Sequence, residues 1–163
     1  MESSLFISKK DTYVVLVSVA FILFWFFAAG SKLYDFGEWK QEMDNQVFSR
    51  RITYGIIYTL PALEIMIAAL LVRSATRLIG MILTFGLMVI FTIYVGLALL
   101  EVYSRTPCNC AGLMGQNSSW AANFKLNLLI TAVAGAGLIL TSKSKERRKK
   151  GMDTVVSHAP LTT

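Results

Sequence analysis

Residues 78–102 read LIGMILTFGLMVIFTIYVGLALLEV, and the first charged residue in this stretch is Glu101. A helix needs about 20 predominantly apolar residues to cross the roughly 30 Å of hydrocarbon in a bilayer. Three more stretches meet this condition, at Tyr13–Leu33, Thr53–Val72 and Ala121–Leu140. Backbone polar groups inside lipid must be satisfied within their own segment, so we predict that these four stretches are membrane-spanning helices.

The composition agrees with a small membrane protein. Of the 163 residues, 55% are hydrophobic and only 16% are charged, which is too apolar for an ordinary soluble domain of this size. The four spans occupy more than half of the chain and leave no room for a separate soluble domain. The predicted fold is therefore an all-α membrane protein, a four-transmembrane-helix bundle in residues 1–141, with a basic and disordered tail at 142–163.

A signal peptide is a second interpretation of the first apolar stretch. Lys9 and Lys10 precede it, and Ala28-Ala29-Gly30-Ser31 resembles the small-residue site at which signal peptides are cleaved. The apolar run is long for a signal peptide, so we expect it to be retained as the first span.

Lysine and arginine residues indicate the orientation of the bundle. With four spans both termini lie on one side of the membrane, and that side carries ten of the 16 lysine and arginine residues. Such residues are enriched on the cytoplasmic side, so we expect both termini to be cytoplasmic. The net charge of +6 then reflects membrane topology, and no basic and aromatic surface remains for nucleic acid.

The segment between the first two spans, Tyr34–Arg51, is patterned as a helix. Phe36, Trp39, Met43 and Val47 recur at spacings of three and four residues, with charged residues between them. This spacing places the apolar side chains on one helical face. We predict an amphipathic helix on the outer surface, lying in the headgroup region or capping the bundle.

The two cysteines of the chain, Cys108 and Cys110, lie in the polar segment between the third and fourth spans. The predicted orientation places them outside the cytoplasm, where disulfides form and persist. Residues two positions apart are about 7 Å apart at Cα in an extended chain, whereas a disulfide prefers roughly 5.5–6 Å. A disulfide between them would be strained, and strained disulfides suit exchange.

Other readings of the pair remain open. A static disulfide would add little stability, because closing so short a loop removes little chain entropy. Half of a site for a soft metal such as Cu(I) is a further reading, but two soft ligands are few, although Met114 lies nearby. We predict no metal site and take Cys108 and Cys110 as the candidate catalytic residues.

Glu64 is the second candidate, because it lies near the middle of the second span. An acid within a span usually faces the bundle interior and is functional. Lys32, at the outer end of the first span, is its candidate partner, and a structural ion pair between the two is an equally good reading. Glu64, Lys32 and Tyr58 are predicted to line a cavity or to handle protons. Tyr54, Tyr58 and Tyr94 are candidates to hydrogen-bond a ring ligand such as a quinone, or else are packing residues.

Several of these residues together resemble the MauE/DoxX family of redox-associated membrane proteins. The resemblance rests on four groups of residues, which are Gly30-Ser31-Lys32-Leu33 with Asp35, Pro61-Ala62-Leu63-Glu64, Cys108-Asn109-Cys110-Ala111-Gly112, and Trp120 with Asn127. The family pattern runs C-G-C-F-G, so Asn109 and Ala111 depart from it. The resemblance covers most of residues 13–140.

The resemblance implies a protein of the bacterial inner membrane that supports disulfide formation in, or maturation of, a periplasmic partner, as in methylamine utilisation. The chain is also similar to vitamin K epoxide reductase and DsbB-type bundles, which pass electrons from a C-x-x-C pair to a quinone. We therefore expect a thiol–disulfide redox protein, with quinone as the candidate cofactor. The alternative is a non-catalytic accessory or assembly subunit of a larger membrane complex, docked through the segment Phe36–Phe48.

Overall fold

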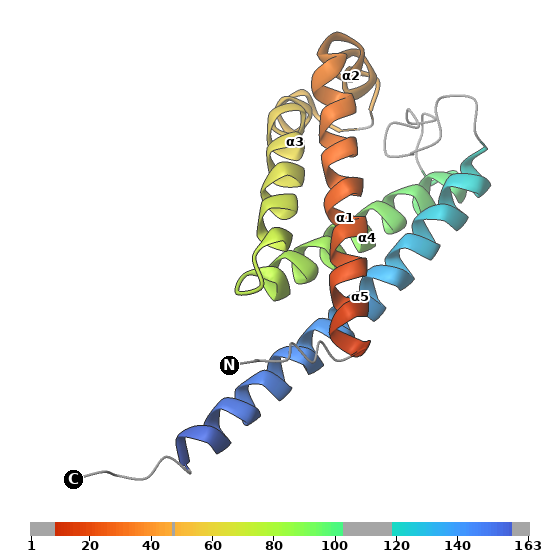
Figure 1. Cartoon of the computed structure of the whole chain (residues 1–163). Helices are drawn as coiled ribbons and strands as arrows, with labels where there is room; N and C mark the ends of the chain where they lie inside the picture. The colour runs from red at the N-terminus through yellow and green to blue at the C-terminus, as the bar shows by residue number, and fades with distance from the viewer. Residues whose placement is uncertain (1–8, 47, 103–118, 158–163) are drawn as a thin grey trace.

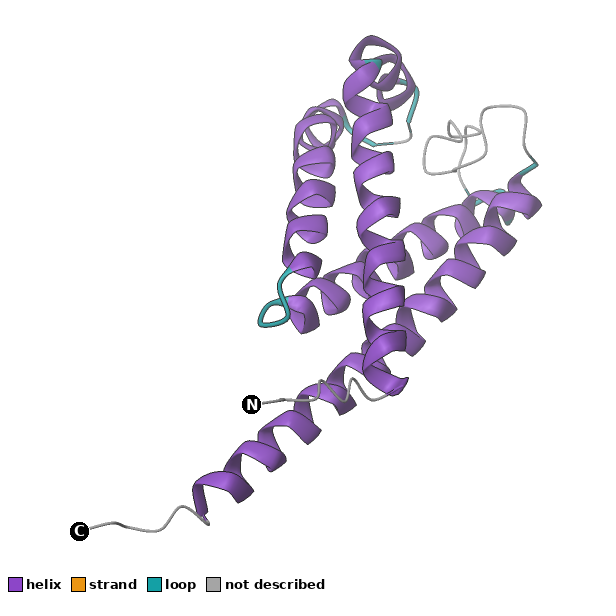
Figure 2. Cartoon of the chain, in the orientation of Figure 1, coloured by secondary structure: helices purple, strands orange, loops and turns teal. Residues whose placement is uncertain are grey.

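The computed structural model describes residues 9–46, 48–102 and 119–157. The secondary structure in these ranges is helical, without a strand (Figure 2). The helices, in chain order, are α1 (Lys9–Tyr34), α2 (Phe36–Asp44), α3 (Arg50–Val72), α4 (Arg77–Leu99) and α5 (Trp120–Ser157). The predicted all-α fold is confirmed.

Four of these helices are long and apolar enough to cross a membrane. The candidate spans are Asp11–Tyr34, Arg50–Val72, Arg77–Leu99 and Trp120–Arg147. They coincide with the four apolar stretches of the sequence, and α2 lies between the first two, where the amphipathic helix was predicted. The chain is a multi-pass membrane protein.

The four long helices pack as two inclined pairs. The most extensive contacts join α1 to α3 and α4 to α5, while α3 also packs on α4 and α1 on α5. In Figure 1 the pair α4 and α5 runs at a slant to the upright α1 and α3. We call one end of the bundle the α2 end, because it contains helix α2. It also contains the end of α1, the start of α3, the end of α4 and the start of α5.

The core joins all four spans. It is built from buried residues of α1, α3, α4 and α5, namely Phe21, Trp25, Ala28, Ile67, Ala68, Leu71, Met81, Met88 and Ala134. Helices in a membrane associate by close packing rather than by the hydrophobic effect. Gly80 permits such packing at the α3–α4 turn, where an added Cβ would lie 3.1 Å from the backbone nitrogen of Leu71. Trp25 adds a polar link, because its Nε1 donates to Thr84 Oγ1 over 3.1 Å.

A hydrogen bond joins helix α2 to α3 one turn before a proline. Pro61 lies inside α3 and has no N–H group, so the carbonyl of Ile57, one turn earlier, loses its helical donor. The indole Nε1 of Trp39 in α2 donates to this carbonyl over 3.1 Å. Trp39 and Met43 are buried against Ile57. The apolar face of α2 is therefore used within the bundle, and α2 caps it.

Helix α5 is longer than its membrane span. It has 38 residues and continues to Ser157, so residues 142–157 of the basic tail are helical, whereas the sequence pattern suggested disorder. Ser144 Oγ donates to Asp11 Oδ1 over 2.6 Å and ties this part of α5 to the start of α1. The helix continues because the tail contains no proline before Pro160 and its lysine, arginine and glutamate residues are good helix formers.

Candidate functional site

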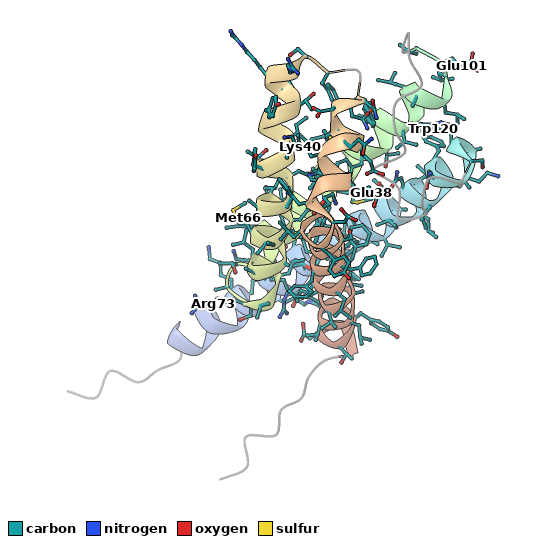
Figure 3. The ribbon with its side chains drawn as sticks, turned by 90° about the horizontal axis from the view of Figure 1, so that it is seen from above. Glu38, Lys40, Met66, Arg73, Glu101 and Trp120 are labelled. Carbon is teal, nitrogen blue, oxygen red and sulfur yellow. The ribbon has the colours of Figure 1, made fainter. Side chains whose placement is uncertain are left out.

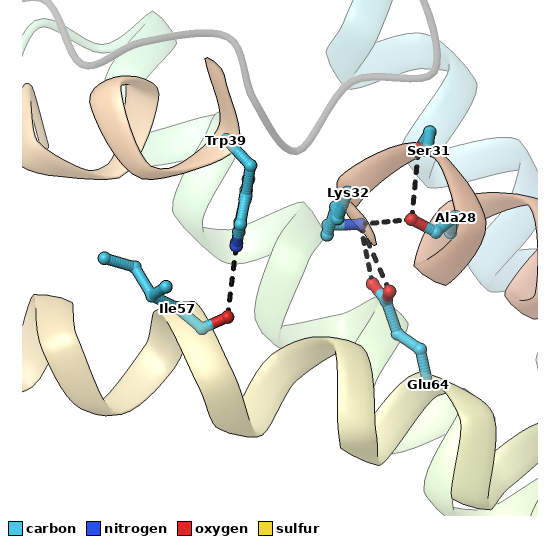
Figure 4. Close-up of polar contacts among 6 residues, drawn as sticks. All are labelled: Ala28, Ser31, Lys32, Trp39, Ile57 and Glu64. Atoms are coloured by element: carbon cyan, nitrogen blue, oxygen red, sulfur yellow. Dashed lines mark hydrogen bonds and ion pairs between the residues drawn. The ribbon is translucent and has the colours of Figure 1, made fainter. Parts of the chain in front are cut away.

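Lys32 and Glu64 form an ion pair between α1 and α3 (Figure 4). Lys32 Nζ lies 2.9 Å from Glu64 Oε1 and 3.2 Å from Oε2. The same ammonium group donates to the backbone carbonyl of Ala28 over 3.0 Å, so its three protons have three acceptors. The side chain of Glu64 is 1% exposed and that of Lys32 is 13% exposed. The structure thus pairs Glu64 with Lys32, the partner that the sequence predicts.

The position of Glu64 follows from the helical pattern of α3. The buried residues of this helix include Ile57, Pro61, Glu64, Ala68 and Leu71, which recur every three or four residues and share one face. Glu64 therefore takes a core position that an apolar residue would otherwise fill. A charge at such a position requires a partner, since an unpaired buried ion is very costly, and Lys32 supplies it from the facing helix.

Trp39 completes the surroundings of the ion pair. Its ring centroid lies 5.4 Å from Lys32 Nζ, within the range at which an ammonium group is attracted to an aromatic face. Because Trp39 is also bonded to Ile57, helix α2 fixes the ring beside the lysine. Figure 4 shows this arrangement, with Trp39 and Lys32 on neighbouring elements above α3.

The ion pair borders a cavity of about 590 Å³ at the α2 end of the bundle. Both Lys32 and Glu64 line it, and its wall is mostly apolar, with rings contributed by α1, α2, α4 and the segment before α3, namely Phe24, Trp25, Phe27, Trp39, Phe48, Phe91 and Tyr94. Small-molecule sites typically enclose about 300–1,000 Å³ with mostly apolar walls and a few polar groups. The volume and the mostly apolar lining of this cavity fall within the range of such sites.

The tyrosines divide between the cavity and the outside of the bundle. Tyr94 lines the cavity, its hydroxyl donates to Gln46 Oε1, and its ring stacks on Phe48 with centroids 5.7 Å apart. Tyr58 is 61% exposed, packs on the ring of Phe36 and is not among the residues that line the cavity. The structure thus brings Lys32, Glu64 and Tyr94 to one cavity and leaves Tyr58 outside it.

Asn127, one of the residues on which the family resemblance rests, is also a polar residue of the cavity wall. It lies on α5, is 4% exposed and lines the cavity. Its Nδ2 atom is buried without a hydrogen-bond partner among the described residues. The signal in the sequence was an amide inside an apolar span, but its lack of a partner is visible only in three dimensions.

The cysteine pair lies outside the described residues, in the connection between α4 and α5. The described ends of this connection are Val102 and Ser119. In Figure 1 the end of α4 and the start of α5 lie in the upper part of the bundle, as α2 does, and Figure 3 labels Glu101 and Trp120, which adjoin these two residues in the sequence. The contact of Tyr94 with Phe48 likewise places the last turns of α4 beside the α2–α3 connection. The segment that carries Cys108 and Cys110 is therefore attached at the end of the bundle that holds the cavity.

Comparison with known families identifies the chain. A family model described as methylamine utilisation protein MauE matches residues 10–140. This range includes the first three candidate spans and the fourth as far as Leu140. The chain belongs to the MauE family. As a MauE protein it is a multi-pass membrane protein of a family that serves methylamine utilisation. Neither a curated relative nor a solved structure matches the chain.

Proposed function

We propose that this MauE protein is a membrane thiol–disulfide redox protein, with Cys108 and Cys110 as its reactive pair. It supports disulfide formation in, or maturation of, a periplasmic partner from the bacterial inner membrane. The observation that carries the proposal is the attachment of the segment with both cysteines at the bundle end that holds the cavity and the Lys32–Glu64 pair. Both cysteines also fall within the matched family region.

The exchange with the partner requires only the two cysteines and a dithiol on the partner. A thiolate of the partner attacks the disulfide between Cys108 and Cys110 and forms a mixed disulfide, releasing one cysteine as a thiol. The second partner thiol then displaces the other cysteine. The partner loses two electrons and two protons, and the pair gains them as two thiols. A two-electron acceptor must then reoxidise the pair.

The orientation of the bundle supports this proposal. The excess of lysine and arginine on the side of the two termini predicts that this side is cytoplasmic. The connection between α4 and α5 then faces the periplasm, where disulfides persist. The accessory-subunit alternative gains less support, because the apolar face of α2, its predicted docking face, packs on Ile57 inside the bundle.

The test is to trap the mixed disulfide. The chain holds only two cysteines, so a Cys110→Ser variant leaves Cys108 as the single thiol. The Cys108 thiolate of this variant attacks the disulfide of an oxidised partner, the reverse of the step above, and the absence of Cys110 leaves the mixed disulfide unresolved. In membranes treated with acid and alkylating agent, we therefore expect this variant to carry adducts with periplasmic proteins that a reductant releases. The Cys108→Ser/Cys110→Ser double variant is the negative control, and Asn109→Ala is the matched loop control that keeps both thiols. Partner disulfides that form normally in the double variant would refute the proposal.

A further inference from the structure

Helix α5 carries a dense group of positive charges beyond its apolar stretch, Ala121–Leu140. Residues 143–150 include six lysine or arginine residues and one acid, Glu146, and we call them the basic segment. Because α5 continues to Ser157, the basic segment is a helical extension of the apolar stretch, near the lower end of α5 in Figure 1. It lies outside the region that the family model matches, so the family match does not account for it.

The bond between Ser144 and Asp11 sets the height of the basic segment relative to the membrane. Asp11 is the first residue of the candidate span in α1, and Ser144 Oγ donates to its carboxylate, so Ser144 lies where the hydrocarbon ends. Lys150 follows six residues later, which is at most about 9 Å further out at 1.5 Å per residue. The headgroup layer on each side of a bilayer is about 5–8 Å thick. The basic segment therefore lies at the depth of the lipid headgroups.

The charged side chains of the basic segment point away from the bundle. Among its residues whose side chains the structure describes, all are exposed except Ser144, which contacts Asp11. Glu146 pairs with Lys150 over 3.0 Å, and both side chains are exposed. One acid compensates at most one of the six positive charges, so the segment presents a large positive charge to its surroundings.

The basic residues lie on two sides of the helix. At about 100° per residue, Lys143, Arg147 and Lys150 fall within a sector of about 60°. Lys145 and Lys149 lie on roughly the opposite side. A nucleic acid duplex or an acidic protein surface would contact one side of the helix and leave the other uncompensated. Lipid headgroups surround a helix that crosses them, so they can compensate both sides.

We propose that the basic segment binds anionic phospholipids in the leaflet on the side of the two termini. Their phosphates accept charge-assisted hydrogen bonds from lysine and arginine side chains. Each basic residue near an anionic membrane surface strengthens binding about fivefold. The bound lipids anchor α5 at the surface opposite the α2 end. This binding does not depend on the thiol–disulfide function proposed for the cysteines.

Energy transfer from the full chain to labelled lipid tests the proposal. In a Cys108→Ser/Cys110→Ser background, Ser142→Cys carries a coumarin donor beside the basic segment, and Ser49→Cys carries the same donor at the α2 end. Both serines are exposed. The vesicles are phosphatidylcholine with a trace of acceptor-labelled phosphatidylglycerol or, in a parallel sample, of acceptor-labelled phosphatidylcholine. Both leaflets contain the same lipids, so the orientation of the reconstituted protein does not affect the result.

We expect the donor at position 142 to transfer more energy to phosphatidylglycerol than to phosphatidylcholine at low salt, and the donor at position 49 to show no preference. High salt should abolish the preference, because it screens exposed charges. Lys145→Gln/Lys149→Gln should lower the preference about fivefold or more, while glutamine keeps the helix propensity of lysine. Glu146→Gln should raise the preference, because it removes the single acid of the segment.

Arg51→Gln/Lys125→Gln is the matched control, because it removes two exposed basic residues at the α2 end. It should leave the preference at position 142 unchanged. Equal transfer to both lipids at that position, a preference that high salt does not reduce, or the same preference in Lys145→Gln/Lys149→Gln as in the control variant would overturn the proposal. Binding of added RNA or polyglutamate without any preference for phosphatidylglycerol would also overturn it, in favour of a soluble polyanion.

Discussion

The ion pair between Lys32 and Glu64 can be tested by removing one or both of its charges. Glu64→Leu leaves the Lys32 ammonium, 13% exposed in the wild type, without its two carboxylate contacts at 2.9 and 3.2 Å. The bond to the Ala28 carbonyl remains, but it does not neutralise the charge. Lys32→Met/Glu64→Leu removes both charges and fills the same volume with apolar side chains.

Breaking a buried pair at one partner typically costs about 3–5 kcal/mol, whereas replacing both partners by apolar residues is often neutral or stabilising. We therefore expect Glu64→Leu to lower the free energy of unfolding by about 3–5 kcal/mol. The double variant should recover most of this loss. Glu64→Gln should lie between them, since its amide oxygen still accepts a hydrogen bond from Lys32 but carries no charge.

The assay is reversible unfolding of the purified protein in mixed micelles with increasing dodecyl sulfate, followed by tryptophan emission. Glu146→Gln is the matched control, because Glu146 pairs with Lys150 at 3.0 Å on α5 with both side chains exposed, and exposed pairs contribute little. If Glu64→Leu unfolded at the same midpoint as this control, or if the double variant were as unstable as the single one, the ion pair would not stabilise the bundle.

Three further predictions concern packing and topology. Trp39→Phe should lower the free energy of unfolding by about 1–3 kcal/mol by orphaning the carbonyl that Pro61 frees, and in a Pro61→Ala background, where a backbone N–H returns, the same change should cost clearly less. Gly80→Ala should destabilise the bundle by about 1–3 kcal/mol, because its Cβ would lie 3.1 Å from the Leu71 backbone nitrogen. Gly86→Ala on the same helix should not destabilise it, because a Cβ there meets nothing within 4 Å. Thermal unfolding of the two variants tests the difference. Alkaline phosphatase fused within the connection between α4 and α5 should be active and fused to the C-terminus inactive, and the opposite pattern would invert the proposed orientation.

The spans were predictable because their signal is long and uniform. About 20 predominantly apolar residues have few structures open to them in a membrane. The Lys32–Glu64 pair followed from the cost of an unpaired charge within such a span. The attachment of Trp39 to the Ile57 carbonyl was not predictable, since apolar spacing shows which face of α2 is buried but not what it contacts. The proline in α3 was the one local signal that a carbonyl needed an external donor.

The tyrosines show where residue type alone was insufficient. Tyr58 and Tyr94 are equally good candidates for a ring ligand by chemistry, but Tyr58 lies six residues before Glu64. At about 100° per residue this places the two side chains roughly 120° apart around α3. Because Glu64 points into the bundle, Tyr58 points away from its interior. The cavity itself is lined by residues of all five helices, so no single segment encodes it.

The most direct test of the proposed function is the midpoint potential of Cys108 and Cys110 in intact membranes. Membranes are equilibrated across a series of thiol redox buffers, quenched with acid, and labelled with a mass-shifting maleimide, which reports only these two thiols. The proposal predicts reversible oxidation and reduction at a potential well above about −300 mV, the upper limit for typical structural disulfides. A pair that stays oxidised, or stays reduced, in every buffer would contradict a thiol–disulfide function.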